Sequence, residues 1–239
     1  MNAIQIAGLS RDYGKRRVVD RLELTVGSGE LFALLGVNGA GKSTTIKMLC
    51  CLTVPTEGDA ALMGHSVRTD SHRAKEVLAV SPQETAVAPG LTVEENLALM
   101  AGVYRRPRTR VGEVMDQLGL GQWAGQRAKT LSGGWQRRLS IAMALVSQPE
   151  VLFLDEPTLG LDVLARRELW GVIRGLKGRT AIVLTTHYLE EAEALADRIG
   201  IMAAGRLRAV GTAEELKALA GCENFEDAFV ALAGEEAAS

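Results

Sequence analysis

The segment from Gly36 to Ser43, with the sequence GVNGAGKS, constrains this chain more than any other. It matches the phosphate-binding pattern G-x-x-x-x-G-K-[ST] at every fixed position. The apolar run at 31–35 before it is typical of a buried parallel strand, and residues 44–49 after it are typical of a helix. Because an ordinary glycine-rich turn needs neither the lysine nor the hydroxyl that follows it, the segment predicts a nucleoside triphosphate site.

Each residue type in this loop has a physical role. Glycines let the backbone turn sharply so that several N–H groups point at one anion, and the helix N-terminus adds partial positive charge. Lys42 is expected to reach the outer phosphates, and the hydroxyl of Ser43 is expected to bind a magnesium ion. The nucleotide-binding residues expected here are Gly36, Asn38, Gly39, Ala40, Gly41, Lys42, Ser43 and Thr44.

Composition narrows the class of protein. The chain has 239 residues, of which 47% are hydrophobic and 23% charged, so it can bury a sizeable core. No apolar run approaches the roughly 20 residues that cross a bilayer, and no signal segment opens the chain, which predicts a cytoplasmic location. A net charge of -2 argues against a general nucleic-acid binder. The three cysteines lack metal-ligand spacing and are expected to be small buried hydrophobes: Cys50, Cys51 and Cys222.

The N-terminal segment alternates apolar and polar residues over 4–9 and again over 22–26. This pattern predicts an antiparallel hairpin, packed beside the nucleotide strand, with its turn at 13–15. Tyr13 at the tip is either an ordinary surface aromatic or a platform for a flat ring. The phosphate loop downstream favours adenine stacking, which would add affinity more than selectivity because every base has a π-face.

In the middle of the chain the sequence pattern changes from that of strands to that of helices. Short strands are expected at 59–63 and 77–80, whereas residues 84–148 read as an all-helical insertion between sheet strands, with a helix start at Thr92 and Glu95. The basic stretch at 104–110 is either a solvated loop between helices or a contact for a partner or lipid headgroups. At the end of this region, Ser132, Gly133 and Gly134 open a helix and form a second candidate anion site, without a lysine.

Three more polar residues follow predicted strands. The run at 151–154 predicts a central strand buried on both faces, and it ends in Asp155 and Glu156 at the edge where α/β sheets bind ligands. Asp155 is suited to magnesium, and Glu156 is suited to polarise water. His187 follows the β-rich run at 180–186 and is expected at the same edge, in contact with a γ-phosphate.

In their order, these motifs resemble the ATP-binding cassette family, the nucleotide-hydrolysing subunits of ABC transporters, over roughly residues 3–220. The resemblance identifies Gln83 as a magnesium- and water-sensing glutamine and places Asp162 in a loop across a dimer seam. It also identifies Ser132, Gly133 and Gly134 as most of the family signature, which covers the γ-phosphate bound by a second copy. Trp135 stands where the signature usually has glutamine, so a side-chain hydrogen bond from this position to the partner's nucleotide is in doubt.

The fold implied is α/β: a P-loop NTPase (RecA-like) core with an antiparallel β subdomain and an inserted α-helical lobe. The expected division is a nucleotide-binding core at 1–83 and 149–220, a helical lobe carrying the signature at 84–148, and a short C-terminal helix with an acidic tail at 221–239.

The activity implied is magnesium-dependent hydrolysis of ATP coupled to transport. Lys42, Glu156 and His187 are the expected catalytic residues, and Ser43, Gln83 and Asp155 the expected metal site. The partners implied are a second copy of the chain and an integral membrane permease, which would hold the protein at the inner face of the cell membrane.

Three further segments resemble the subgroup that pairs with separately encoded ABC-2 type exporters of drugs, glycolipids or ions: 91–96, 156–162 and 224–228. Two alternatives remain, a soluble ABC ATPase of translation or DNA repair and a regulatory cassette that binds ATP with little turnover. A guanine-specific switch protein is disfavoured because the chain has no Asn-Lys-x-Asp motif.

Overall fold

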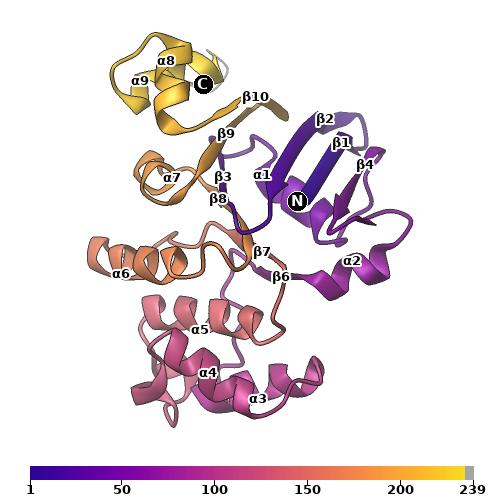
Figure 1. Ribbon diagram of the computed structural model, residues 1–239. Coiled ribbons are helices and arrows are strands. Elements are labelled where there is room, and N and C mark those ends of the chain that lie inside the picture. Colours follow the sequence, from indigo (N-terminus) through magenta and orange to yellow (C-terminus); the bar gives the residue numbers. More distant parts are fainter. Residues whose placement is uncertain (235–239) are drawn as a thin grey trace.

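Two β-sheets and a separate group of helices make up the molecule, as the computed structural model in Figure 1 shows; residues 1–234 are described. The acidic tail expected at the end of the chain lies, for 235–239, outside the described residues. In Figure 1 the antiparallel sheet lies beside the central sheet, and helices α3, α4 and α5 gather at the opposite end from α8 and α9.

The smaller sheet is antiparallel throughout and has the strand order β2-β1-β4-β5. Its strands are β1 (Asn2–Tyr13), β2 (Arg16–Gly27), β4 (Glu57–Leu62) and β5 (His65–Ser66). The expected hairpin is therefore present, and β1 pairs with β4 on its other side. The hairpin packs beside the nucleotide strand as expected, because its buried side chains share a core with Phe32 and Leu34. The pairing with β4 was not predicted, because alternation reveals a half-buried strand without revealing which strand lies next to it.

The larger sheet is mixed and has the order β10-β9-β3-β8-β7-β6, parallel except for the β9–β10 pair. Its strands are β3 (Leu31–Leu35), β6 (Leu78–Ser81), β7 (Val151–Asp155), β8 (Ala181–Thr186), β9 (Arg198–Ala203) and β10 (Arg206–Gly211). Every residue of β3, β7 and β8 is buried. Parallel strands covered on both faces read as continuous apolar runs, as these do.

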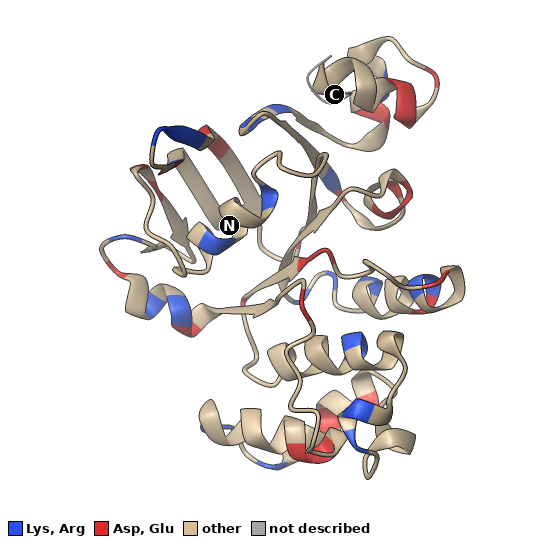
Figure 2. Ribbon diagram, turned by 180° about the vertical axis from the view of Figure 1, so that it is seen from behind, with Lys and Arg blue, Asp and Glu red and all other residues tan. Residues whose placement is uncertain are grey.

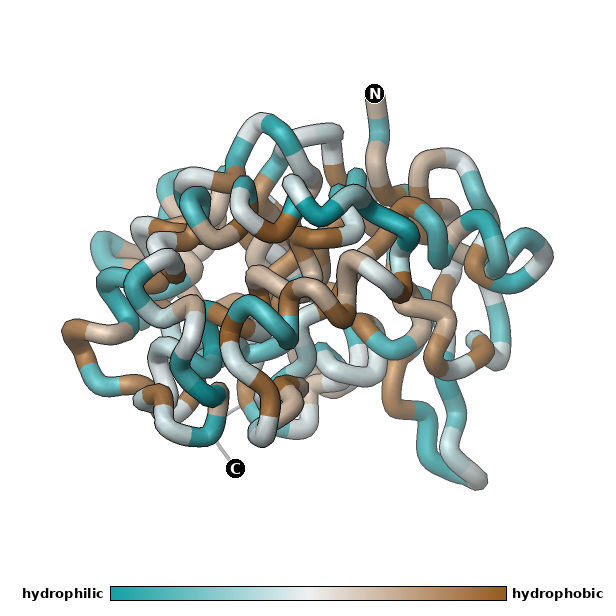
Figure 3. Tube along the Cα trace, turned by 90° about the horizontal axis from the view of Figure 1, so that it is seen from below, coloured by the Kyte–Doolittle hydropathy of each residue, from teal (hydrophilic) through white to brown (hydrophobic). Residues whose placement is uncertain are grey.

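Successive residues of β3 point to opposite faces and so join two different cores. Leu31, Ala33 and Leu35 pack into the core shared with the helical lobe and the C-terminal helices, whereas Phe32 and Leu34 pack into the core shared with the antiparallel sheet. Seen from below, hydrophobic segments concentrate inside the trace and hydrophilic ones lie mostly at its periphery (Figure 3).

The helices that pack around the central sheet begin with α1 after the phosphate loop. They are α1 (Lys42–Leu49), α2 (Ser71–Val77), α6 (Val163–Arg174), α7 (Leu189–Leu195), α8 (Ala213–Ala220) and α9 (Phe225–Ala233). The short helix α2 was not expected from the sequence, because Ala74 is its one buried residue and it has no apolar stripe. No helix of the described chain is long and apolar enough to cross a membrane.

Between β6 and β7 the named elements are all helical: α3 (Val93–Val103), α4 (Thr109–Gln117), α5 (Gly133–Leu145) and two short 3-10 turns, η1 (Gly121–Trp123) and η2 (Ala128–Thr130). Thr92 and Glu95 form a capping box at the start of α3. Two arginines of the basic stretch bind the end of α5: Arg106 donates to the carbonyl of Ser147 and Arg110 to that of Leu145, at 2.5 and 3.0 Å. These two side chains therefore have a structural role. The sequence pattern allowed this stretch to be either a solvated loop or a contact for a partner or lipid headgroups, and it did not predict this role.

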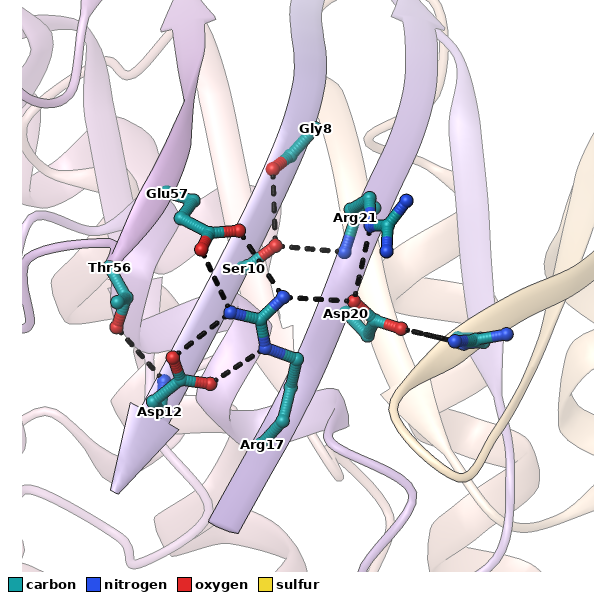
Figure 4. Close-up of polar contacts among 9 residues, drawn as sticks. Gly8, Ser10, Asp12, Arg17, Asp20, Arg21, Thr56 and Glu57 are labelled. Atoms are coloured by element: carbon teal, nitrogen blue, oxygen red, sulfur yellow. Dashed lines mark hydrogen bonds and ion pairs between the residues drawn. The ribbon is translucent and has the colours of Figure 1, made fainter. Parts of the chain in front are cut away.

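A polar network joins the antiparallel sheet to the hairpin of β9 and β10 (Figure 4). Arg17 pairs with Asp12, Asp20 and Glu57 at 2.8, 3.2 and 3.0 Å. Asp20 pairs in turn with Arg206, at 2.6 Å, and its amide donates to the carbonyl of Gly205. The pKa of Asp12 is lowered by Arg17, and that of Asp20 by Arg206. Over the whole ribbon, acidic and basic residues are interspersed (Figure 2).

Candidate nucleotide-binding and catalytic site

The phosphate loop joins the C-terminal end of β3 to the N-terminus of α1. Gly39 and Gly41 have φ values of 82° and 105°, in the left-handed region that favours glycine. A Cβ at Gly41 would lie 2.8 Å from the carbonyl oxygen of Val18, so this position also has no room for a side chain. The backbone amides of Gly39, Gly41 and residues 42–44 have no hydrogen-bond partner within residues 1–234. They form an anion-binding concavity at a helix N-terminus.

Lys42 lies within this loop and is almost fully buried. Its Nζ donates to the carbonyls of Gly36 and Val37, at 2.7 and 3.1 Å, and lies 3.5 Å from Oε1 of Glu156. Burial lowers the pKa of Lys42, while the charges of Glu156 and Asp155 oppose that shift. A lysine held by neutral carbonyls and one carboxylate is positioned to bind a polyanion.

Asp155 ends β7 and lies directly beside the loop. Its Oδ1 accepts hydrogen bonds from the hydroxyls of Ser43 and Thr185, at 3.1 and 2.5 Å. The loop, the end of β7 and the end of β8 therefore converge on one carboxylate oxygen. Sequence reasoning did not identify Thr185; a polar residue near the end of an otherwise apolar strand was the available signal.

Glu156 is 6% exposed and its φ of 49° lies in the left-handed region, which residues other than glycine seldom occupy. Its Oε2 lies 2.7 Å from Nδ1 of His187, which follows β8. Its amide donates to the backbone oxygen and the hydroxyl of Thr185. Unusual backbone conformations of this kind concentrate at functional sites and are held by surrounding contacts.

Lys42, Glu156 and His187 line one pocket of about 380 Å³, and Asp155 lies outside its lining. Its lining includes all the predicted loop residues from Asn38 to Thr44, together with Gln83, Glu156 and His187. Val18 and Leu159 also line it and had not been singled out from the sequence. Tyr13 does not line the pocket; it lies at the turn of the β1–β2 hairpin, 47% exposed, with the Arg11 guanidinium 4.7 Å from its ring centre.

The signature residues lie elsewhere on the same chain. Ser132 is the N-cap of α5 and its side chain makes no capping hydrogen bond, and the helix begins at Gly133. Ser132 and Gly134 line a small hollow beside α6 and not the phosphate pocket. Asp162 caps α6 by accepting a hydrogen bond from the amide of Ala165. Within one chain, therefore, the two predicted anion sites are separate.

Trp135 belongs to an aromatic cluster of the helical lobe. Its ring centre lies 5.3 Å from that of Trp123 and 4.2 Å from the guanidinium of Arg138. Arg138 also pairs with Glu168 of α6, at 3.2 Å. The indole is thus engaged by neighbours from its own chain.

Arg137 is a further residue at the site that sequence reasoning missed. It is 4% exposed, and its guanidinium donates to the backbone carbonyls of Gln83 and Glu156. A signal was present, because residue 137 shares one face of α5 with Ile141 and Ala144, both buried. The cysteines also differ from expectation: Cys50 is buried, whereas Cys51 and Cys222 are half-buried.

The donor set around the loop fits a nucleotide and a magnesium ion. The free amides and Lys42 complement phosphate oxygens, and Mg²⁺ prefers hydroxyl, amide and carboxylate oxygens of the kind that Ser43, Gln83 and Asp155 carry. No group of three or more His, Cys, Asp or Glu side chains in the described part of the chain has the arrangement of a metal site.

The sequence of residues 19–159, more than half of the chain, matches the profile of the ABC transporter family. The chain belongs to this family. As an ABC ATPase it binds and hydrolyses ATP, and its fold is the P-loop NTPase fold with an antiparallel β subdomain and a helical lobe, as expected.

Curated relatives of this ABC protein include two named for resistance or export. The daunorubicin/doxorubicin resistance ATP-binding protein DrrA of Streptomyces peucetius is 44% identical over 224 residues, covering 92% of this chain and 68% of the relative. The Nod factor export ATP-binding protein I of Ralstonia nicotianae is 41% identical over 219 residues, covering 89% of this chain and 68% of the relative.

Solved structures agree with the family assignment. An ATP-binding subunit of an ABC transporter superposes with a TM-score of 0.86 at 28% identity, covering 97% of this chain and all of that one. A dimeric ATP-binding cassette in a post-hydrolysis state with ADP and Pi superposes with a TM-score of 0.76 at 25% identity, covering 87% of this chain and 98% of that one.

Proposed function

We propose that this ABC ATPase energises an exporter by closing as a dimer around ATP. The observation that carries the catalytic part is the contact of one buried carboxylate, Glu156, with both Lys42 and His187 at the mouth of the phosphate loop. That arrangement places a candidate base beside the cation that would bind the γ-phosphate.

The residue roles follow from this geometry. Lys42 and the loop amides neutralise the phosphates, and Glu156 accepts a proton from the attacking water. His187, hydrogen-bonded to Glu156, orients that carboxylate and contacts the γ-phosphate. Ser43, Gln83 and Asp155 hold magnesium, which supplies charge neutralisation of the phosphate oxygens when bound.

A second copy of the chain completes the site in this proposal. The free hydroxyl of Ser132 and the first amides of α5 form an anion-binding helix terminus that lies away from the chain's own loop. Near Asp162, exposed apolar side chains mark a surface suited to burial between copies: Leu159, Val163 and Leu164. A related cassette is a dimer with ADP and Pi.

The membrane partner is proposed to dock in an apolar groove between the core and the helical lobe. The groove holds about 520 Å³ and is bordered by β6, α3 and α5, with Leu52, Met100, Tyr104 and Met143 among its lining. An amphipathic helix of a permease fits a groove of this kind. Docking there would place the chain peripherally, at the inner face of the membrane.

Export is inferred from the relatives, two of which are named for drug resistance or Nod factor export. The test of direction is to isolate the membrane protein that co-purifies with this chain and to reconstitute both in vesicles with the ATPase outside. ATP-dependent accumulation of a transported compound inside such vesicles supports export. ATP-dependent loss of a preloaded compound contradicts it.

The test of the shared site is the dependence of turnover on protein concentration. A site completed by a second copy predicts that ATP turnover per chain falls on dilution into the monomer range, while ATP binding by each chain persists. Turnover per chain that stays constant down to concentrations at which only monomer exists contradicts the shared site. Sedimentation at each concentration establishes which state is present.

A further inference from the structure

Arg137 lies on α5, one turn after the signature glycines, and is buried among backbone groups instead of side-chain carboxylates. Its Nη2 donates to the carbonyls of Asp155 and Glu156, at 2.6 and 2.9 Å, and its Nε to that of Pro157, at 2.9 Å. Its Nη1 donates to the carbonyls of Gln83, at 3.1 Å, and Pro82. A guanidinium has five N–H donors in a rigid plane, so its whole donor capacity is matched by these carbonyls.

The five carbonyls belong to two segments that are far apart in sequence. Residues 82 and 83 directly follow β6, and residues 155–157 comprise the last residue of β7, the strand paired with β6, and the two residues after it. Each segment carries a residue of the proposed site, Gln83 or Glu156. Arg137 therefore ties three elements together: the helix that begins at the signature, the segment of Gln83 and the segment of Glu156.

The backbone of Glu156 needs such support. Its φ of 49° is unfavourable for a residue with a side chain, so surrounding contacts must hold it. Thr185 binds the amide of Glu156, and Arg137 binds its carbonyl and the carbonyl on either side. With both flanking peptide groups fixed, the carboxylate of Glu156 is directed at Lys42 and His187.

We propose that Arg137 is a positioning residue for ATP hydrolysis, which fixes the backbone of Glu156. The proposal rests on the role of Glu156 proposed above. Lysine cannot replace arginine in it, because one ammonium concentrates its donors at a single point and cannot reach both segments as a planar fork does. Arg137 itself does not line the phosphate pocket.

The test separates kcat from KM for ATP in two variants, Arg137→Met and Arg137→Lys. Loss of positioning lowers kcat by about tenfold or more in each, because small displacements of a catalytic group cost up to about a hundredfold in rate. KM for ATP and the affinity for a fluorescent ATP analogue stay within about threefold, since the loop is untouched. Arg137→Lys keeps the buried charge and remains informative if Arg137→Met does not fold.

Arg110→Met is the matched control for lost stability. Arg110 also donates from the helical lobe to a backbone carbonyl, that of Leu145, but at the far end of α5 from the site. Its loss is expected to lower the melting temperature while kcat, measured where the protein is folded, stays within about twofold. Arg137→Lys with a lowered melting temperature and an unchanged kcat overturns the proposal, because Arg137 is then structural like Arg110.

Glu156→Gln distinguishes the two proposals. If it is inactive while the Arg137 variants keep their kcat, the role of Arg137 fails and that of Glu156 stands. If Glu156→Gln retains full turnover, the role of Glu156 fails, and the role of Arg137 fails with it.

Discussion

Oε2 of Glu156 lies 2.7 Å from Nδ1 of His187, while Oε1 of the same carboxylate lies 3.5 Å from Nζ of Lys42. With the proton on Nδ1, the imidazole donates to the carboxylate and its Nε2 is left as an acceptor. One buried carboxylate thus links the end of β8 to the phosphate loop. A change in the charge of Glu156 therefore alters the electrostatic environment of both His187 and Lys42.

Glu156→Gln removes the proposed base and keeps the shape of the side chain. We expect ATP turnover to fall by about a hundredfold or more, because general base catalysis contributes roughly 10²–10⁴-fold. ATP binding is expected to strengthen, since a negative charge near the phosphates is lost, and the chain is expected to accumulate as an ATP-bound dimer. Turnover assays and size-exclusion chromatography in saturating ATP measure the two effects.

Glu150→Gln is the control for this change, because Glu150 is exposed and precedes the opposite end of β7. It should leave turnover unchanged. A Glu156→Gln protein that stays monomeric in saturating ATP would contradict the trapped dimer.

Trp135→Gln restores the residue usual in the family signature. We expect the rate of ATP hydrolysis to change by less than about tenfold, because the indole is engaged by Trp123 and Arg138 of its own lobe. Losing these contacts should destabilise the fold by about 1–2 kcal/mol. Thermal melting and steady-state kinetics test this, with Trp135→Phe retaining a ring as the comparison. A change above tenfold would mean that Trp135 acts on the nucleotide.

Tyr13→Ala tests the stacking role proposed for the hairpin tip. Base–aromatic stacking contributes roughly 1–3 kcal/mol, so the Kd for ATP should rise about 5- to 150-fold. Tyr13→Phe keeps the ring and should bind ATP as the unmodified chain does. Equilibrium titration with ATP decides; equal affinity in the Ala and Phe variants would leave Tyr13 as an ordinary exposed aromatic beside Arg11.

Glu191→Gln tests the buried carboxyl on α7, which is fully buried and accepts a hydrogen bond from Nε1 of Trp170 at 3.0 Å. Burial raises the pKa of Glu191 above its ordinary value of 4.5. In the window from 4.5 up to the raised pKa, the folded state holds a proton that the unfolded state has released. The free energy of unfolding therefore falls as pH rises through this window, by up to about 1.4 kcal/mol per pH unit.

Glutamine lacks this titration and can still accept the bond from Trp170. The melting temperature of Glu191→Gln should therefore match that of the unmodified chain below pH 4.5 and exceed it increasingly above. Melting curves from pH 4 to 8 measure the difference, with the exposed neighbour Glu190→Gln as control. Parallel curves for Glu191→Gln and the unmodified chain would show that Glu191 ionises as freely as an exposed carboxyl.

Features determined by neighbouring residues could be predicted from the sequence. The phosphate loop, the turn after Tyr13 and the helix start at Thr92 depend on a few consecutive residues, and the structure places each where expected. The buried strand ending in Asp155 was readable because parallel strands are continuously apolar.

Features that depend on contacts between residues distant in sequence could not be predicted from the sequence. The residues around β1 do not indicate whether it pairs with β4 or with β3, since both pairings bury the same alternating residues. An arginine on a helix is ordinarily solvated, and although Arg137 lies on the buried face of α5, the sequence does not show which distant backbone carbonyls it binds. Strand ends that meet at one edge predicted that Glu156 and His187 would be close, but not which atoms would touch.

Gly36, the first glycine of the phosphate loop, lies in close contact with β9, a strand that is translated much later. A Cβ at Gly36 would lie 2.3 Å from the carbonyl oxygen of Met202 in β9, and β3 pairs with β8 on one side and β9 on the other. During synthesis the loop is therefore translated early, but β3 has no strand to pair with until β8 and β9, within residues 181–203, have emerged from the ribosome. Assembly dominated by such distant pairings is slow, and a nascent chain halted before β8 exposes an unpaired apolar strand. The nucleotide site is thus among the first parts to be translated and among the last to be built.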